Sequence, residues 1–519
     1  MFPDGTIRAL CVLLLHGFIF LFLRNDSDGG IMTKSVTRKS GAEMVLQSAR
    51  LSRVSLALAK HGVLLPLVFL PPTVWAASEL AWGLVLALLA PAALGGGLSL
   101  AVARTALPKD LRQVEAIVVL ALLFVLTPVL SIPAFMTLGM PPVDALFEGM
   151  SALTTTGLSV ATNADTWPFA GHLLRSWMQW CGGLAMATAV LAMLIGPGVT
   201  ARKLGKVNMD DGDLISSTRT HARQLLGAYA GITLVFGAAI SASIGSVPEG
   251  LLLTLSAVST GGFAYLPDSV ASYAPMTQGL TISASLCGAV SLLAVALLCK
   301  RDWSNAWLTG SLQRMALWSM GCVLTLCICV WVLGGSGYYV HAWNLLSAIS
   351  TAGYSIGAMP TEPVLLVFFI AVMAIGGDVG STAGGIKLAR FLTLMRTGQH
   401  AARGPRLPVN AVAPMREHGQ VLKQSQLIAL LALLLFYSVF VLSLWTLFLA
   451  HGHPPLPALF DAVSAFSTVG LSTGVIGADN PALLKIATTF AMLLGRLEFV
   501  AVLLLVLPRT WHIPHHRRK

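Results

Sequence analysis

Long apolar stretches separated by short polar connections dominate the chain. Crossing a bilayer takes about 20 apolar residues, and runs of this kind recur along most of the sequence. Their length and basic flanks indicate helices rather than strands. We expect membrane-spanning helices near residues 54–74, 80–103, 114–136, 171–196, 222–244, 276–299, 315–333, 363–395, 426–449 and 486–507. The pattern predicts an all-α membrane protein.

One eight-residue pattern appears four times between these stretches. Residues 151–158 read SALTTTGL, 256–263 read SAVSTGGF, 347–354 read SAISTAGY and 464–471 read SAFSTVGL. Every copy starts with Ser-Ala, carries Gly at its seventh position and falls between two expected spans. We therefore predict four helix–pore-loop–helix units around one pore.

The repeats divide the chain into segments. We expect pore units at 105–200, 201–300, 301–397 and 426–519, the last with a basic tail, and an extra transmembrane hairpin at 51–104 ahead of them. Residues 1–50 form an N-terminal extension that is either cytoplasmic or the product of an upstream start codon. Their apolar run 9–23 is short for a span and resembles a signal-like segment. Residues 398–425, polar and basic, are expected to be a cytoplasmic linker.

The composition supports a membrane protein, with 55% hydrophobic residues, 11% charged residues and a net charge of +11. Most Lys and Arg residues gather in 24–60, 104–112, 202–223, 300–314, 387–423 and 509–519, whereas acidic residues occupy the intervening connections. Such alternation is the positive-inside pattern. It predicts that the basic segments and the C-terminus lie in the cytoplasm, opposite an acidic outer face that concentrates cations. Nucleic acid is not an expected partner.

The threonines and glycines of the repeat suit an ion pathway. Non-helical backbone is tolerated at membrane depth only where it is buried in protein or lines water. Rings of backbone carbonyls replace the water shell of potassium in selective pores, and glycine allows the backbone angles that such rings need. A single Ser-Thr-Gly is more typical of a turn or a helix contact. Four matched copies favour the pore.

The span 363–395 contains GGDVGSTAGG at 376–385. Each glycine costs a helix roughly 1 kcal/mol against alanine, so we expect a break here; the alternative is a close helix crossing through small residues. The stretch is neither a Walker A loop, because Ile386 follows Gly385, nor a GxGD protease motif, because Ile375 replaces the first glycine. We therefore predict that the protein is not an enzyme.

The four copies, together with LLRSWMQWCGGL (173–184), GGDVGSTAGGIKLARF (376–391) and LLGRLEFVAVLLLVLP (493–508), resemble the TrkH/KtrB family of bacterial potassium uptake proteins over about 51–511. The resemblance implies a location in the bacterial inner membrane, potassium as the transported ion and no covalent cofactor. It also implies a homodimer and a cytoplasmic ring of nucleotide-binding regulatory subunits similar to TrkA or KtrA. A sodium- or proton-coupled symporter with mixed selectivity is the alternative.

The resemblance also assigns residues. Potassium is expected at a filter made by Thr155, Thr156, Gly157, Thr260, Gly261, Gly262, Thr351, Ala352, Gly353, Thr468, Val469 and Gly470. An intramembrane gating loop would include Gly376, Gly377, Gly380, Ser381, Thr382, Gly384 and Gly385. Arg496 is expected in the cavity below the filter; the alternative is a structural pair with Glu498 or Asp378.

Overall fold

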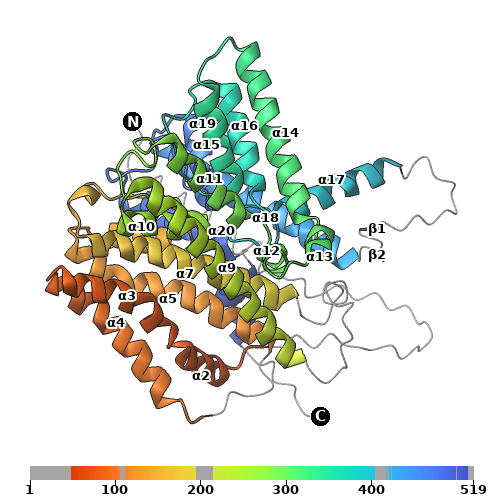
Figure 1. Cartoon of the computed structure of the whole chain (residues 1–519). Coiled ribbons are helices and arrows are strands. Elements are labelled where there is room, and N and C mark those ends of the chain that lie inside the picture. Colours follow the sequence, from red (N-terminus) through yellow and green to blue (C-terminus); the bar gives the residue numbers. More distant parts are fainter. Residues whose placement is uncertain are drawn as a thin grey trace, which may run out of the picture. The chain divides into compact units, whose positions relative to one another are not determined.

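The computed structural model describes residues 48–105, 112–194, 214–403, 416–417, 420–421, 424–497 and 500–511. These residues are mainly helical (Figure 1). Within them, the strands are the two-residue β1 (Arg416–Glu417) and β2 (Gln420–Val421), which pair antiparallel. The predicted all-α class is confirmed. The apolar run at 9–23 and Glu498 lie outside the described residues.

The helices before the first repeat and around it run in chain order. The leading segment contains α2 (Leu51–His61), α3 (Leu64–Ser78) and α4 (Trp82–Ala101). The first unit contains α5 (Gln113–Thr137), the short α6 (Pro142–Leu153), the 3-10 turn η1 (Ala164–Thr166) and α7 (Phe169–Leu194). The second contains α9 (Leu214–Ile244), the short α10 (Val247–Val258), α11 (Pro275–Ala289) and α12 (Leu292–Cys299).

The second half of the chain repeats this order. The third unit contains α13 (Trp303–Leu308), α14 (Ser311–Val332), the short α15 (Tyr338–Ser350), α16 (Pro363–Ile375) and α17 (Leu388–Arg403). The fourth contains α18 (Gln424–Ala450), the short α19 (Pro455–Phe466), α20 (Ala482–Leu497), α21 (Val500–Val506) and α22 (Pro508–Trp511). Each repeated octapeptide thus begins in the last turn of a short helix and continues beyond the end of that helix.

Six described helices are long and apolar enough to cross a bilayer, by length and composition. They occupy Leu51–Ser78, Trp82–Ala101, Val114–Thr137, Ala222–Ile244, Ser311–Val332 and Gln426–Ala450. A seventh candidate is the pair α11 and α12. The other expected spans are shorter or more polar than these helices. Helices α16 and α20 have 13 and 16 residues, and α7 carries the buried polar residues His172, Arg175 and Gln179.

One span expected from the sequence is wrong. The span 276–299 is not one helix, because α11 ends at Ala289, α12 begins at Leu292 and the two are bent by 105°. Helix α17 continues to Arg403, so the first residues of the expected linker 398–425 are helical. As expected, the span 363–395 is interrupted, between Ile375 and Leu388.

The leading hairpin packs against the first unit (Figure 1). Helices α3 and α4 approach closely, since a Cβ built on Gly95 would lie 2.7 Å from the Cβ of Leu65. Glu79, after α3, accepts hydrogen bonds from the backbone N–H groups of Phe169 and Ala170, both at 3.0 Å. These groups are unpaired donors at the start of α7, so the hairpin caps this helix.

Three of the carboxylates expected on an acidic outer face are buried in the protein. Glu148 and Asp461 are fully buried, and Asp144 is 7% exposed. Asp144 accepts a hydrogen bond from Lys485 Nζ at 2.7 Å, and Glu148 accepts one from Arg175 at 3.0 Å. Charged groups of this kind are rarely fully buried unless they are paired. These acids therefore join segments of the protein rather than facing water.

Candidate functional site: a ring of backbone carbonyls and the loop beside it

The four short helices end in the same way. In each, a threonine at the C-cap or directly after it adopts a left-handed conformation, with φ near +50° to +55° at Thr155, Thr260, Thr351 and Thr468. The N–H of the residue after each of these threonines donates back into the helix, to the carbonyls of Ser151, Ser256, Ser347 and Ser464, at 2.8 to 3.0 Å. Threonine rarely adopts positive φ. Its occurrence at four matched positions shows that the four segments share one backbone path.

The glycines of the four segments fit against one another in a closed cycle. A Cβ built on Gly157 would lie 2.1 Å from the carbonyl oxygen of Gly261, and one on Gly262 would lie 2.2 Å from that of Ala352. A Cβ on Gly353 would lie 2.2 Å from the oxygen of Val469, and one on Gly470 would lie 2.1 Å from that of Thr156. The cycle therefore returns to its first member. We call the carbonyls of Thr156, Gly261, Ala352 and Val469 the carbonyl ring.

This ring explains why glycine occupies the seventh position of each repeat. All four glycines have positive φ, between +74° and +95°, where side chains are strained. A side chain there would also strike the carbonyl of the next segment. Carbonyl oxygens gathered around one axis can replace the water shell of a cation. Among the described residues, no group of three His, Cys, Asp or Glu side chains offers a competing metal site.

Side chains around the ring hold the segments in place. Gln179 of α7 donates to the carbonyl of Gly261 at 2.5 Å and accepts from Ser256 at 2.7 Å. A Cβ on Gly261 would meet Gln179 at 2.3 Å, which explains why glycine stands here and not Thr, Ala or Val as in the other copies. Tyr437 of α18 bonds to Ser467 at 2.7 Å. No pattern in the sequence indicates these contacts.

A buried polar residue in three of the short helices anchors the chain that returns from the ring. Glu148 accepts from Ser159 at 3.0 Å, Asn344 accepts from the N–H of Ile356 at 3.0 Å, and Asp461 accepts from the N–H of Thr473 at 2.7 Å. All three stand three residues before the first serine of the repeat. That shared offset is a signal the sequence contained. The second unit has Leu253 there, and Tyr354 donates to its carbonyl at 3.2 Å.

Glycines in the following helices let these helices press on the ends of the short helices. A Cβ on Gly182 would lie 1.9 Å from the carbonyl oxygen of Leu153, and one on Gly495 would lie 1.7 Å from that of Phe466. In the second unit, a Cβ on Gly288 would lie 2.4 Å from the oxygen of Val258. The WCGGL and LLGRL motifs are therefore packing sites beside the ring.

The non-helical segment 376–387, which we call the 376–387 loop, lies against the segments that build the ring. The N–H of Gly384 donates to Thr351 Oγ1 at 2.8 Å, and Thr382 Oγ1 donates to the carbonyl of Val258 at 3.2 Å. A Cβ on Gly384 would lie 2.0 Å from the carbonyl oxygen of Ser467. The loop thus touches three of the four segments. The predicted residues from Gly376 to Gly385 all fall in it.

The break between α11 and α12 belongs to the same contact. The carbonyls of Gly288 and Ala289 accept from the N–H groups of Thr382 and Asp378, at 3.1 and 3.0 Å. The N–H of Leu292 donates to the carbonyl of Gly380 at 3.0 Å. Buried backbone groups must find partners. The loop supplies the hydrogen-bond partners that the interrupted helix lacks. The break between α11 and α12 and the break between α16 and α17 therefore depend on each other.

Arg496 also meets the loop. It is 3% exposed and donates to the carbonyls of Thr382 at 2.6 Å and Gly182 at 3.4 Å, while its Nε has no partner in the described part. Asp378 pairs with Arg314 of α14 at 2.6 Å. The alternative pairing of Arg496 with Asp378 is therefore wrong. The predicted residue stands beside the loop, next to the ring.

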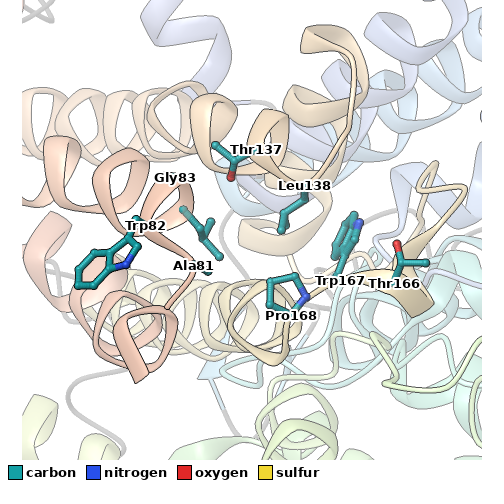
Figure 2. Close-up of a pocket in the computed structure, with 9 residues that line it drawn as sticks. Ala81, Trp82, Gly83, Thr137, Leu138, Thr166, Trp167 and Pro168 are labelled. Carbon is teal, nitrogen blue, oxygen red and sulfur yellow. The ribbon is translucent and has the colours of Figure 1, made fainter. Parts of the chain in front are cut away.

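A separate hollow of about 310 Å³ lies between the leading hairpin and the first unit (Figure 2). Trp82 and Leu84 of α4, Thr137 of α5, and Trp167 and Pro168 before α7 contribute to its lining. Trp167 lies under the guanidinium of Arg175, 4.8 Å from the ring centroid. The hollow does not touch the carbonyl ring.

The fold and the site define a multi-pass membrane protein in which four related segments surround a ring of carbonyls. A family model described as "Cation transport protein", TrkH, matches residues 130–333 and 333–513. The chain belongs to this family of transport proteins, which are not enzymes.

Known proteins are similar over most of the chain. An uncharacterized cation transporter of Methanocaldococcus jannaschii is 26% identical over 411 residues, which cover 78% of this chain and 84% of the relative. The Trk system potassium uptake protein TrkH of Halomonas elongata is 28% identical, covering 78% and 87%. The crystal structure of the potassium transporter TrkH from Vibrio parahaemolyticus superposes with a TM-score of 0.76 at 20% identity, over 89% of this chain and 100% of that one. The last similarity shows the shared fold.

Proposed function

We propose that the chain takes up potassium across the bacterial inner membrane, through a pore that the carbonyl ring encircles. The closed cycle of four glycines and four carbonyls carries this proposal. Oxygens held rigidly around an axis can replace the water of a dehydrated potassium ion. Relatives named as potassium uptake proteins support potassium as the ion. Transport of this kind needs no covalent cofactor.

In this proposal, the ion meets backbone oxygens in two layers. One layer is the carbonyl ring, and the next is formed by the carbonyls of Thr155, Thr260, Thr351 and Thr468, which lie one residue nearer to the short helices. The C-terminal ends of the short helices add partial negative charge near the ion. Gly157, Gly262, Gly353 and Gly470 do not bind through side chains; they permit the close approach.

The 376–387 loop is the proposed gate. Its contacts with the ring segments and with Arg496 support a closed state, in which loop backbone and a buried positive charge lie next to the ring. An ion would then have to displace the loop to leave the ring. Withdrawal of the loop, with Arg496 released from the carbonyl of Thr382, would open the path.

The proposal extends to assembly and orientation. Two copies would form a homodimer in the membrane, with the basic connections and the C-terminus in the cytoplasm. A cytoplasmic ring of nucleotide-binding subunits would regulate the gate. Relatives named as parts of a Trk system support a partner of this kind. Purification from native membranes after mild crosslinking should recover both a dimer and a soluble nucleotide-binding protein.

Ion flux into vesicles tests the central claim. The purified full chain, reconstituted in lipid vesicles, should take up rubidium in exchange for internal potassium, and potassium should compete better than sodium. Sodium- or proton-coupled transport would instead make the uptake depend on a sodium or pH gradient. Vesicles with correctly folded protein and no rubidium uptake, in any gradient, would refute the proposal.

A further inference from the structure

A short helix at the start of the third unit exposes a large apolar and basic surface. Helix α13 shows Trp303, Trp307 and Leu308 at 67%, 61% and 74% exposure. Lys300 and Arg301, just before it, are also exposed, and neither side chain makes a hydrogen bond or ion pair within the described residues. We call these five residues the α13 corner. Large apolar side chains beside free cations call for a specific environment.

The next helix shows that this environment is the edge of a bilayer. Helix α14 exposes Leu317, Met320, Leu324 and Ile328 at 52% to 64%, spaced three or four residues apart, so they form one stripe. Its 22 residues span about 33 Å, close to the roughly 30 Å of a hydrocarbon core. Trp331, 73% exposed, stands at the far end. Tryptophans at both ends of an apolar stripe mark the two membrane interfaces.

The α13 corner is joined to the 376–387 loop from both sides. On one side, a tight turn links the corner to α12, whose first N–H, that of Leu292, donates to the carbonyl of Gly380 at 3.0 Å. On the other side, Arg314 of α14 donates to the carbonyl of Thr309 at 3.3 Å and pairs with Asp378 at 2.6 Å. The corner thus connects the two elements that hold the loop.

We propose that the head groups of anionic phospholipids bind Lys300 and Arg301 while Trp303 and Trp307 enter the interface, and that this binding favours opening of the loop. The charge and the continuity with the α14 stripe fit a lipid surface. A lipid that holds the corner in the membrane plane draws α12 and α14 away from the ring. The loop follows them, because Leu292 of α12 bonds to Gly380 and Arg314 of α14 pairs with Asp378. The gating part of this inference rests on the proposed function.

The test uses the purified full chain in vesicles of phosphatidylcholine with increasing phosphatidylglycerol. We expect rubidium flux to rise severalfold with the anionic lipid, since each basic side chain at the surface strengthens attraction roughly fivefold. The double variant Lys300→Gln, Arg301→Gln should lose this rise. Arg104→Gln, an exposed basic residue at the end of the leading hairpin, is the matched control and should keep it.

A second readout separates lipid binding from transport. Native mass spectrometry of wild type should show retained phosphatidylglycerol molecules that the double variant loses and the Arg104→Gln control keeps. Flux that is independent of anionic lipid, or lowered by it, overturns the proposal, as does equal lipid retention in all three proteins. If no protein conducts rubidium in any lipid, the proposed function fails, and lipid retention still decides the binding claim.

Discussion

At the scale of the residue, the ring depends on backbone angles that few side chains accept. Thr155, Thr260, Thr351 and Thr468 each hold a positive φ, and each is followed two residues later by a glycine that does the same. A residue held in such a conformation stores about 1–3 kcal/mol of strain. The hydrogen bonds that close the short helices and the packing around them hold this strain in place. Rigid carbonyls are the consequence.

Replacing a ring glycine should therefore change selectivity. Gly353→Ser and Gly262→Ser combine a strained φ with a clash at 2.2 Å against the next carbonyl, so we expect at least a roughly tenfold loss of potassium preference over sodium, equal to a change of about 1.4 kcal/mol. Competition of sodium with rubidium uptake measures it. Gly139→Ser is the control, because Gly139 has φ of +91° but open space around it. Preference retained in both ring variants would contradict the filter assignment.

The charge of Arg496 should oppose conduction. A buried cation near the ion path repels potassium, and this repulsion is large where water is scarce. Arg496→Gln should raise rubidium flux severalfold and weaken the hold on the carbonyl of Thr382, whereas Arg496→Lys keeps the charge and should stay close to wild type. Flux in vesicles, normalised to folded protein, is the measurement. Lower flux in the Gln variant with unchanged flux in the Lys variant would show that the charge assists conduction.

At the scale of the element, the loop and the broken helices behave as one unit. The 376–387 loop satisfies the broken end of α11 and the first N–H of α12, and it bonds to threonines of two ring segments. A change in the loop must therefore break contacts with the ring before the loop can move. This arrangement suits a gate with a closed state of defined stability.

Weakening the loop should raise flux. Deleting Gly380–Gly384 removes the carbonyls that bind Arg496 and Leu292, and we expect raised, poorly regulated rubidium flux in a folded protein. Thr382→Val is a milder variant that loses the hydroxyl whose single proton lies within reach of the carbonyls of Val258 and Gly288, a hydrogen bond worth about 1 kcal/mol, and should raise flux severalfold.

The control for the loop variants is Thr325→Val on α14, where the threonine bonds within its own helix. Its flux should equal that of wild type. Folded loop variants with the same flux and regulation as the control would show that the glycines serve packing.

The sequence predicted the elements that repeat and missed those that depend on distant partners. The octapeptide could be recognised because a left-handed turn needs glycine at a fixed offset. The loop could be recognised because five glycines in ten residues cannot make a cheap helix. The break at 290–291 could not, because residues 289–291 contain neither glycine nor proline, and its cause is the loop almost a hundred residues later. The sequence also could not predict which groups surround Arg496, because they come from distant parts of the chain.

At the scale of the whole molecule, the fourth unit closes back on the first. Lys485 of α20 pairs with Asp144 of α6, 341 residues away in the chain. Elsewhere, the N–H of Ala49 donates to the carbonyl of Thr510 at 2.7 Å, and the neighbouring Arg50 pairs with Glu115 of α5 at 2.7 Å. A ring of four segments on one chain has one junction that no direct connection spans. These contacts supply that junction.

Replacing one partner of the Lys485–Asp144 pair should destabilise the protein more than replacing both partners. Both side chains are less than 10% exposed, and an uncompensated buried charge costs about 3–5 kcal/mol. Lys485→Met and Asp144→Asn should each lower the melting temperature in detergent, and the double variant should recover much of the loss. Asp165→Asn, at an exposed position, is the control and should melt like wild type. A double variant that loses the sum of both single effects, or single variants that melt like the control, would show that the pair does not close the ring.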